Sequence, residues 1–199
     1  MQDIPRCAWC QDGGPMQAYH DEEWGVPVDD DRRHFEYLMM EVMQCGLSWR
    51  LMLERREAFR QAFDGFDYER IAAYGPGEEA RILRAPGMIR SPGKIRAVIQ
   101  NARVYEGILQ EYGSFAAYLA AFAGDRPRRY PAHADTGCAR NALSDRISAD
   151  LRRRGMKYLG PVTVYAHLQA SGVINDHEPG CRRGQWLQER YPCVICEET

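Results

Sequence analysis

Apolar residues recur along this chain with the spacing of helices rather than of strands. The first clear stripe follows an acidic run at residues 29–31 and falls at i, i+3, i+4 and i+7 of one helix face: Phe35, Leu38, Met39 and Val42. The acidic run supplies the N-cap and first-turn carboxylates that favour a helix start. A second helix is expected from about Trp49 to Phe63, because Asp64 and Gly65 then provide an end.

Further helices are expected along the rest of the chain. Ser91 and Pro92 are typical of an N-cap and a first helical residue, and a core-facing stripe follows them: Ile95, Val98, Ile99, Ala102 and Tyr105. Caps and apolar spacing predict three shorter helices: residues 114–122, 143–155 and 161–172. Because the only short strand candidate is residues 162–165, the pattern predicts an all-α fold, built as one compact body or two interleaved helical lobes.

Composition narrows the class of protein without identifying it. A chain of 199 residues can bury one sizeable core or two small ones, and 45% hydrophobic with 27% charged residues exclude a disordered protein. No apolar run approaches the roughly 20 residues of a membrane helix. The first seven residues lack the basic and then apolar layout of a signal peptide. A cytoplasmic protein without membrane association is therefore expected.

The net charge of −2 hides an asymmetry between two parts of the chain. Residues 1–80 hold 8 basic and 17 acidic side chains, whereas residues 81–199 hold 18 basic and 11 acidic ones. This division is compatible with one basic face for a polyanion, and equally with two solvated faces of a helical protein. Lysine occurs only at positions 94 and 157, which leaves few candidates for lysine chemistry.

Seven cysteines, an odd number, are better explained as metal ligands and free thiols than as disulfides in a protein that is not exported. Thiols and imidazoles gather near both ends of the chain, and zinc prefers four such ligands in a tetrahedron. Two ligand sets compete: Cys7/His20/His177/Cys181, and a ribbon-like Cys7/Cys10/Cys193/Cys196. Spacing alone slightly favours the ribbon, and unrelated free cysteines are the third possibility.

Two other features could bind charged ligands. The turn within residues 152–161 is basic and carries glycine, so its backbone N–H groups could bind a phosphate, although an ordinary helical corner is the simpler explanation. Glu41 is a lone carboxylate among apolar neighbours, which is costly to bury without a partner. Nearby aromatic residues could surround a flat cationic ligand or simply fill the core: Trp9, Tyr19, Trp24 and Trp49.

Four strings resemble the DNA-3-methyladenine glycosylase I family: Cys-Ala-Trp at 7–9, Tyr-His-Asp-Glu-Glu-Trp-Gly-Val-Pro at 19–27, Gly-Leu-Ser-Trp at 46–49 and Val-Ile-Asn-Asp-His at 173–177. The likeness runs in order from Cys7 to about Cys181, nearly the whole chain. It implies an all-α, helix-hairpin-helix type enzyme that flips 3-methyladenine out of double-stranded alkylated DNA and hydrolyses its N-glycosidic bond. A single catalytic domain over residues 1–199 is expected, with its hairpin at about 140–172. It is expected to act as a monomer without a nucleotide cofactor.

The resemblance also implies roles for individual residues. Glu41 and Tyr19 would be catalytic, and Trp9 and Trp49 would bind the flipped base. DNA contacts are implied for four residues: Gly46, Leu47, Lys157 and Gly160. One structural zinc ion would be held by the first of the two ligand sets, Cys7, His20, His177 and Cys181, which overrules the ribbon and would tie the chain termini together.

Two departures from the family pattern concern the pocket. Met16 stands where many members have tyrosine, and Val42 follows the glutamate where glycine is common. These two residues are therefore expected to change the shape of the pocket and, with it, the lesion that is preferred. The tail with Cys193 and Cys196 lies beyond the family's core pattern.

Other classes of protein share some of these features. A non-catalytic, zinc-stapled DNA-binding module would have the basic turn, but it would not need a carboxylate in an aromatic pocket. A zinc hydrolase would need an open coordination position, against which four protein ligands argue. A glycosylase with lyase activity would need a lysine nucleophile. Neither Lys94 nor Lys157 has an obvious claim to that role, so a monofunctional enzyme is expected.

Overall fold

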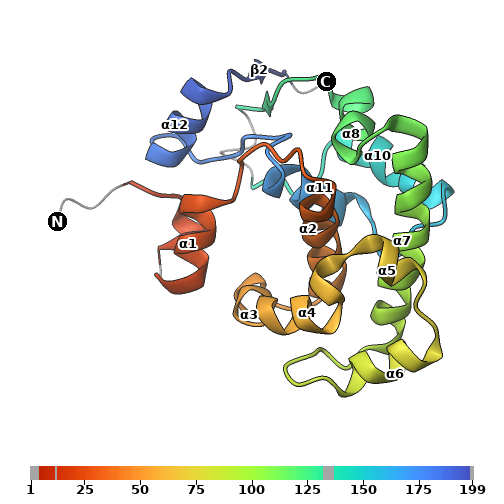
Figure 1. Ribbon diagram of the computed structural model, residues 1–199. Helices are drawn as coiled ribbons and strands as arrows, with labels where there is room; N and C mark the ends of the chain where they lie inside the picture. Colours follow the sequence, from red (N-terminus) through yellow and green to blue (C-terminus); the bar gives the residue numbers. More distant parts are fainter. Residues whose placement is uncertain (1–4, 12, 132–136, 198–199) are drawn as a thin grey trace.

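The computed structural model describes residues 5–11, 13–131 and 137–197, and most of them lie in helices (Figure 1). The two longest helices are α2 (Asp31–Gln44) and α7 (Pro92–Tyr112). The remaining α-helices are α1 (Gly14–Glu22), α3 (Trp49–Glu54), α4 (Arg56–Ala62), α5 (Tyr68–Ala72), α6 (Pro76–Arg84), α8 (Phe115–Ala123), α10 (Ala142–Arg153), α11 (Pro161–Ala170) and α12 (Arg182–Arg190). Short 3₁₀ turns η1 (Ala8–Cys10) and η2 (Asp64–Phe66) and strands β1 (Arg128–Arg129) and β2 (Val194–Ile195) complete the elements. The all-α prediction is confirmed.

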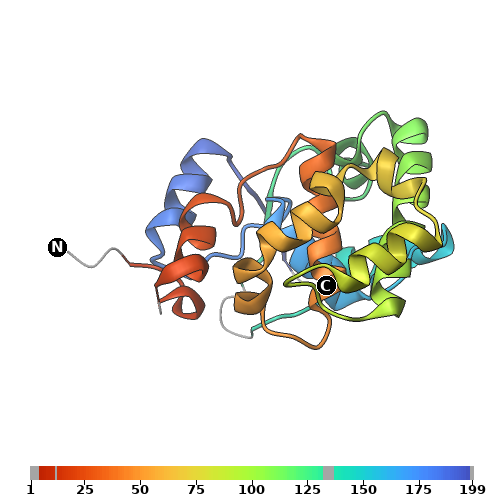
Figure 2. The ribbon, with the colours of Figure 1, turned by 60° about the horizontal axis from the view of Figure 1, so that its bottom comes forward.

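Helix α2 runs through the centre of the molecule and packs against α7, α8, α11 and α3 (Figures 1 and 2). Its start follows the acidic run, because the Asp30 side chain accepts a hydrogen bond from the backbone N–H of Arg33. Every residue from His34 to Met43 is buried. Glu41, near the end of this helix, is therefore placed inside the protein by the apolar residues around it.

The helix predicted over residues 49–63 is wrong in one respect. It breaks at Arg55, whose φ of −101° and ψ of 2° end α3 and begin α4. The change of direction places the Arg56 guanidinium against the carboxylates of Glu23 and Glu36, at 2.8 and 2.5 Å. These largely buried ion pairs link the end of α1 to α2 and α4. The apolar pattern of a single helix could not predict this contact.

The strand candidate at residues 162–165 is also wrong, because these residues form the first turns of α11. Pro161 occupies the first helical position after Gly160, and this start signal outweighs the β-propensity of the valines. The two strands lie elsewhere. Strand β2 runs parallel to β1, and Arg128 of β1 also bridges to Ile174.

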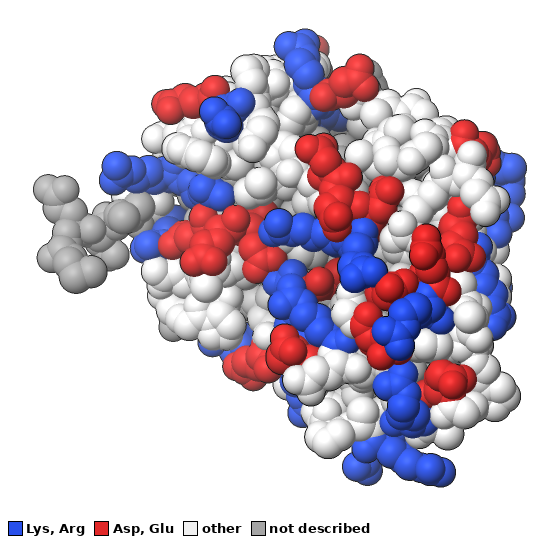
Figure 3. Space-filling view, in the orientation of Figure 1, with Lys and Arg blue, Asp and Glu red and all other residues white. Residues whose placement is uncertain are grey.

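Helix α1, near the start of the chain, lies beside α12, near its end, in both ribbon views (Figures 1 and 2), and Arg183 of α12 donates to the Glu22 carbonyl of α1. Basic and acidic side chains do not form separate faces on the side seen in Figure 3, where blue and red atoms interleave. Ion pairs such as Arg32 with Asp67 and Arg60 with Glu36 also bring opposite charges together. Within the described part of the chain, no helix combines the length and the apolar character needed to cross a membrane.

Candidate active site and metal centre

A cavity of about 520 Å³ opens between α1, α2, α3 and α11. It brings together four residues that the sequence predicts for the base pocket: Trp9, Tyr19, Glu41 and Trp49. Trp24 also contributes to the wall. These residues come from separate elements, so the pocket exists only in the folded chain.

Glu41 is the buried carboxylate of this cavity. Only 6% of the residue is exposed, and among the described residues no basic side chain pairs with its carboxylate. Burial alone raises the pKa of Glu41 to about 8. The site is therefore electrostatically incomplete, and a cationic ligand could supply the charge that the protein does not.

Aromatic rings form the walls around this carboxylate. The ring centroid of Tyr19 lies 5.4 Å from that of Trp49 and 6.4 Å from that of Trp9, and Trp9 lies 5.1 Å from Trp24 at a steep angle. Burial, and then the nearby Glu41 charge, raise the pKa of Tyr19 well above its usual range. Its hydroxyl therefore stays protonated and can act as a hydrogen-bond donor.

The two departures from the family pattern differ in their effect on this pocket. Met16 lines the cavity, so a flexible thioether replaces an aromatic wall there. Val42 is fully buried in the core and is absent from the described lining. Met16, rather than Val42, therefore changes the shape of the space open to a ligand.

The cavity also contains polar residues that were not predicted as part of the site. Asp176 accepts hydrogen bonds from the Tyr165 hydroxyl and, at 2.9 Å, from the Gln169 amide. Gln44 and Glu178 also line the wall. Asp176 was visible in the Asn-Asp-His string, but only the fold shows that its carboxylate reaches the pocket and not the histidine cluster beside it.

The predicted DNA contacts lie in two turns. Gly46, with φ of +82°, follows the end of α2, and the turn is closed by the Leu47 N–H donating to the Gln44 carbonyl at 2.6 Å. Lys157 and Gly160 lie in the turn between α10 and α11, where Gly160 is the N-cap of α11. Lys157 is exposed, and among the described residues no acidic side chain pairs with it.

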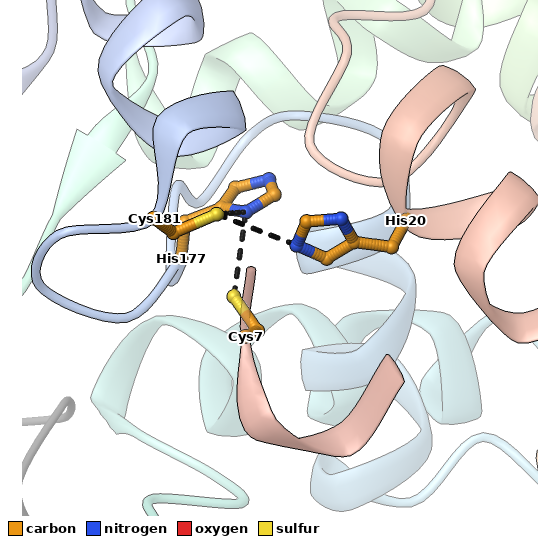
Figure 4. A group of neighbouring side chains, drawn as sticks. All are labelled: Cys7, His20, His177 and Cys181. Carbon is orange, nitrogen blue, oxygen red and sulfur yellow. Dashed lines mark hydrogen bonds between the residues drawn. The ribbon is translucent and has the colours of Figure 1, made fainter. Parts of the chain in front are cut away.

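Four residues from the two chain ends form a compact buried cluster: Cys7, His20, His177 and Cys181 (Figure 4). Their ligand atoms all lie within 4.8 Å of one another. The His177 Nδ1 atom is 3.5 Å from the Cys7 sulfur and 3.3 Å from the Cys181 sulfur, and the Cys181 sulfur is 3.5 Å from His20 Nε2. A tetrahedron with usual zinc–sulfur and zinc–nitrogen bonds has edges of about 3.3 to 3.8 Å. The cluster could therefore hold a metal ion.

The outward nitrogens of the two imidazoles support this interpretation. His20 Nδ1 lies 2.8 Å from the Asp21 carboxylate, and His177 Nε2 lies 3.2 Å from the Trp24 carbonyl oxygen. Each acceptor fixes the ring proton on the outward nitrogen, so the inward nitrogen offers its lone pair to the cluster. Space is tight here: a Cβ atom on Gly184 would lie 2.4 Å from His177 Cβ.

The ribbon set favoured by spacing is wrong. Cys10 is buried with its thiol donating to the Cys7 carbonyl, so it does not face the cluster as a ligand. Cys193 accepts from the Asn175 amide and Cys196 from Arg128, on either side of β2. In the part of the chain that the structure describes, these thiols do not converge with Cys7.

Comparison with known proteins gives a consistent result. Residues 9–184 match the model of the methyladenine glycosylase family. The chain is 37% identical over 179 residues to "DNA-3-methyladenine glycosylase 1" of Escherichia coli (strain K12), which covers 89% of this chain and 96% of that protein. A crystal structure of 3-methyladenine DNA glycosylase I is 39% identical, covers 89% of this chain and 98% of that one, and has a TM-score of 0.84.

A tyrosine-to-phenylalanine variant of 3-methyladenine DNA glycosylase I, solved in complex with 3-methyladenine, also matches. It is 31% identical, covers 90% of this chain and 97% of that one, and has a TM-score of 0.85. The family model, the sequence identity and the similarity of fold therefore agree on one class of protein, the 3-methyladenine glycosylases. This chain belongs to the methyladenine glycosylase family.

Proposed function

We propose that this protein is a DNA-3-methyladenine glycosylase that removes the alkylated base from double-stranded DNA by base flipping and leaves the backbone intact. The observation that carries the proposal is the unpaired carboxylate of Glu41 inside an aromatic cavity. Methylation at N3 makes adenine cationic and weakens its glycosidic bond. The pocket therefore supplies a negative charge that can pair with the cationic lesion. An undamaged neutral base would gain no such pairing.

In the proposed reaction the target nucleotide leaves the duplex, at a cost of a few kcal/mol, and its base enters the cavity. Glu41 pairs with the cationic base, Tyr19 donates a hydrogen bond, and the rings of Trp9 and Trp49 close on the base's faces. The Gly46–Leu47 turn fills the gap in the duplex. Bond cleavage gives a sugar with oxocarbenium character, and water then completes hydrolysis.

The metal proposed for the cluster is one structural zinc ion per chain. The soft donor set and the inward lone pairs fit zinc. When bound, the ion would hold the chain ends together and would leave no open position for substrate, because all four ligands are protein side chains. The whole chain, residues 1–199, would act as a single catalytic domain. The cytoplasmic location and the monomeric state stay predictions from the sequence.

Base release from DNA is the direct test of this function. Duplex DNA treated with a methylating agent is incubated with the protein, and the released bases are identified by chromatography. We expect free 3-methyladenine and intact phosphodiester strands until alkali is added. A protein that binds the duplex and releases no base would instead be a zinc-stapled DNA-binding module.

The pH dependence of excision follows from Glu41. Its pKa of about 8 leaves the carboxyl neutral in most molecules at pH 7, and only the charged form attracts a cationic base. The kcat/KM for 3-methyladenine release is therefore expected to rise from pH 6 through pH 8 and to level off above about pH 9, since kcat/KM reports the free enzyme. The measurement is single-turnover excision with subsaturating enzyme across this range. A profile that falls over the same interval would contradict a catalytic carboxylate.

Lys157 gives a prediction about DNA affinity. Reversing its charge with Lys157→Glu should weaken binding to damaged and intact duplex equally, because a phosphate contact carries no base information. The salt dependence of log K should also fall by about one unit of slope. Arg190→Glu is the matched control, since α12 lies on the other side of the molecule (Figure 1). Equal losses in both variants would show a general charge effect instead of a hairpin contact.

A further inference from the structure

Helix α7 connects the two turns that the proposed function assigns to DNA. Near its start, the ammonium of Lys94 is buried and donates to the carbonyl oxygens of Met43 and Cys45, both at 2.7 Å. These carbonyls belong to the last turn of α2, where helix carbonyls lack partners within the helix. A cation at a helix C-terminus also complements the helix dipole. Lys94 therefore fixes the point at which α2 ends and the Gly46–Leu47 turn begins.

Two turns further along α7, Asn101 holds the other DNA-binding turn. Its side chain is fully buried, and its amide bonds the backbone of Lys157 and also donates to the Met39 sulfur of α2 at 3.7 Å. The Lys157 N–H donates to Asn101 Oδ1 at 2.7 Å, and Asn101 Nδ2 donates to the Lys157 carbonyl at 3.1 Å. The backbone of the proposed phosphate-binding residue is thus clamped on both sides.

The two polar residues share one face of the helix. Positions seven apart are nearly in line after two turns, and the rise between them is about 10.5 Å. Between and beyond them the helix is anchored in the core by Ile95, Val98 and Ala102, which are fully buried. Because a buried ammonium and a buried amide cost free energy unless fully hydrogen-bonded, apolar residues would serve packing better here. Their polar groups instead form hydrogen bonds to the backbone of the two turns.

We infer that Lys94 and Asn101 are positioning residues that set the spacing between the Gly46–Leu47 turn and the Lys157 turn, so that both can engage one duplex when a base is flipped. The inference rests on the proposed function. Neither residue touches the base: Lys94 is occupied by two carbonyls and Asn101 by the hairpin backbone. Lesion recognition on DNA should depend on both residues, whereas binding of the free base should not.

The same helix offers a matched control. Arg103 donates to the carbonyl oxygens of Ala72 and Tyr74 at 2.9 and 3.0 Å, so it also caps the end of a short helix with a cation. That end, at α5, carries no residue of the proposed site. Arg103→Met and Lys94→Met each remove one positive charge and two hydrogen bonds to carbonyls. They differ in which turn is released and in burial, since Lys94 is buried and Arg103 is exposed.

The experiment compares Lys94→Met, Asn101→Leu, their double variant and Arg103→Met with the wild type. Three affinities are measured: for free 3-methyladenine by tryptophan fluorescence, for intact duplex, and for duplex with an abasic-site analogue. Lys94→Met should lose about tenfold or more in affinity for the abasic duplex, the scale of a lost charge-assisted hydrogen bond, with little change on intact duplex. Asn101→Leu should weaken both duplexes. Free-base binding should stay within about twofold in each, and Arg103→Met should behave as wild type.

The double variant tests whether the two residues act together on the spacing or cap their turns independently. If they act together, precise placement of one turn contributes little to affinity once the other turn is released. The loss of affinity for the abasic duplex in the double variant should then be smaller than the sum of the two single losses. Strictly additive losses, or a normal abasic preference in Lys94→Met, would overturn the inference. If Lys94→Met does not fold, Lys94→Gln removes the charge and keeps an N–H donor, and retention of the normal preference there overturns it equally. Failure of the wild type to bind abasic duplex would instead reject the proposed function.

Discussion

Replacement of Glu41 by glutamine is expected to slow the release of 3-methyladenine from DNA by about 10²-fold or more, the scale of losing one preorganised electrostatic stabiliser. Glutamine keeps the size of the side chain and one acceptor oxygen, so the change isolates the negative charge. No described cation accompanies Glu41, and its i±3 and i±4 neighbours are uncharged. The measurement is single-turnover excision at pH 8, where the wild-type carboxylate is substantially charged.

The stability of this variant is expected to change in the opposite direction. An ordinary glutamate in the unfolded chain loses its proton near pH 4.5, whereas Glu41 in the folded protein keeps it until about pH 8. Burying this group therefore lowers the free energy of unfolding increasingly as pH rises through that interval. Glu41→Gln should raise the free energy of unfolding by on the order of 1 to 3 kcal/mol at pH 7. Its zinc content should not change.

A matched control is available in the same cavity. Glu178→Gln makes the same chemical change at a carboxylate that is partly exposed and already bonded to the Ala8 N–H at 2.9 Å. It should reduce excision far less than Glu41→Gln. Normal excision by Glu41→Gln would show that the pocket assignment is wrong. Unfolding of that variant would show that Glu41 belongs to a structural pairing.

Much of the helical framework could be predicted from the sequence, because several helices have capping residues and apolar spacing that mark their ends. Helix α8 begins where Ser114 accepts a hydrogen bond from the Ala117 N–H, and α2 and α7 combine start signals with apolar stripes. Helix α12 gives no such signal. It is strongly polar, and Gly184 and Leu187 are its buried residues. Its position depends on packing over His177, a contact that local patterns do not contain.

The candidate site shows the same division between local and tertiary information. The isolation of Glu41 could be predicted, because its own helix places no cation beside it. The aromatic walls could be named through the family resemblance but not placed, since Trp9 and Trp49 come from η1 and α3. Spacing chose the wrong metal ligands because Cys7-x2-Cys10 looks like a half-site. In the structure the Cys10 thiol bonds to the Cys7 carbonyl instead.

Replacement of His177 by alanine is expected to abolish zinc binding and to lower the melting temperature by on the order of 10 °C. Purified wild-type protein should hold about one zinc per chain, since four protein ligands close a structural site. The reason for the loss of stability is topological. The ligands come from the two ends of the chain, so α1 and α12 would lose the bond that holds them side by side.

Two variants separate metal loss from the general cost of losing a buried side chain. His167→Ala removes an equally buried imidazole that lies outside the cluster, against His34, and should lower the melting temperature while keeping zinc. Cys193→Ser alters a thiol of the rejected ribbon set and should change neither zinc content nor melting temperature appreciably. Zinc is measured by elemental analysis after gel filtration. Retention of zinc by His177→Ala together with its loss from Cys193→Ser would restore the ribbon, because the metal would then follow the C-terminal thiols rather than the buried cluster.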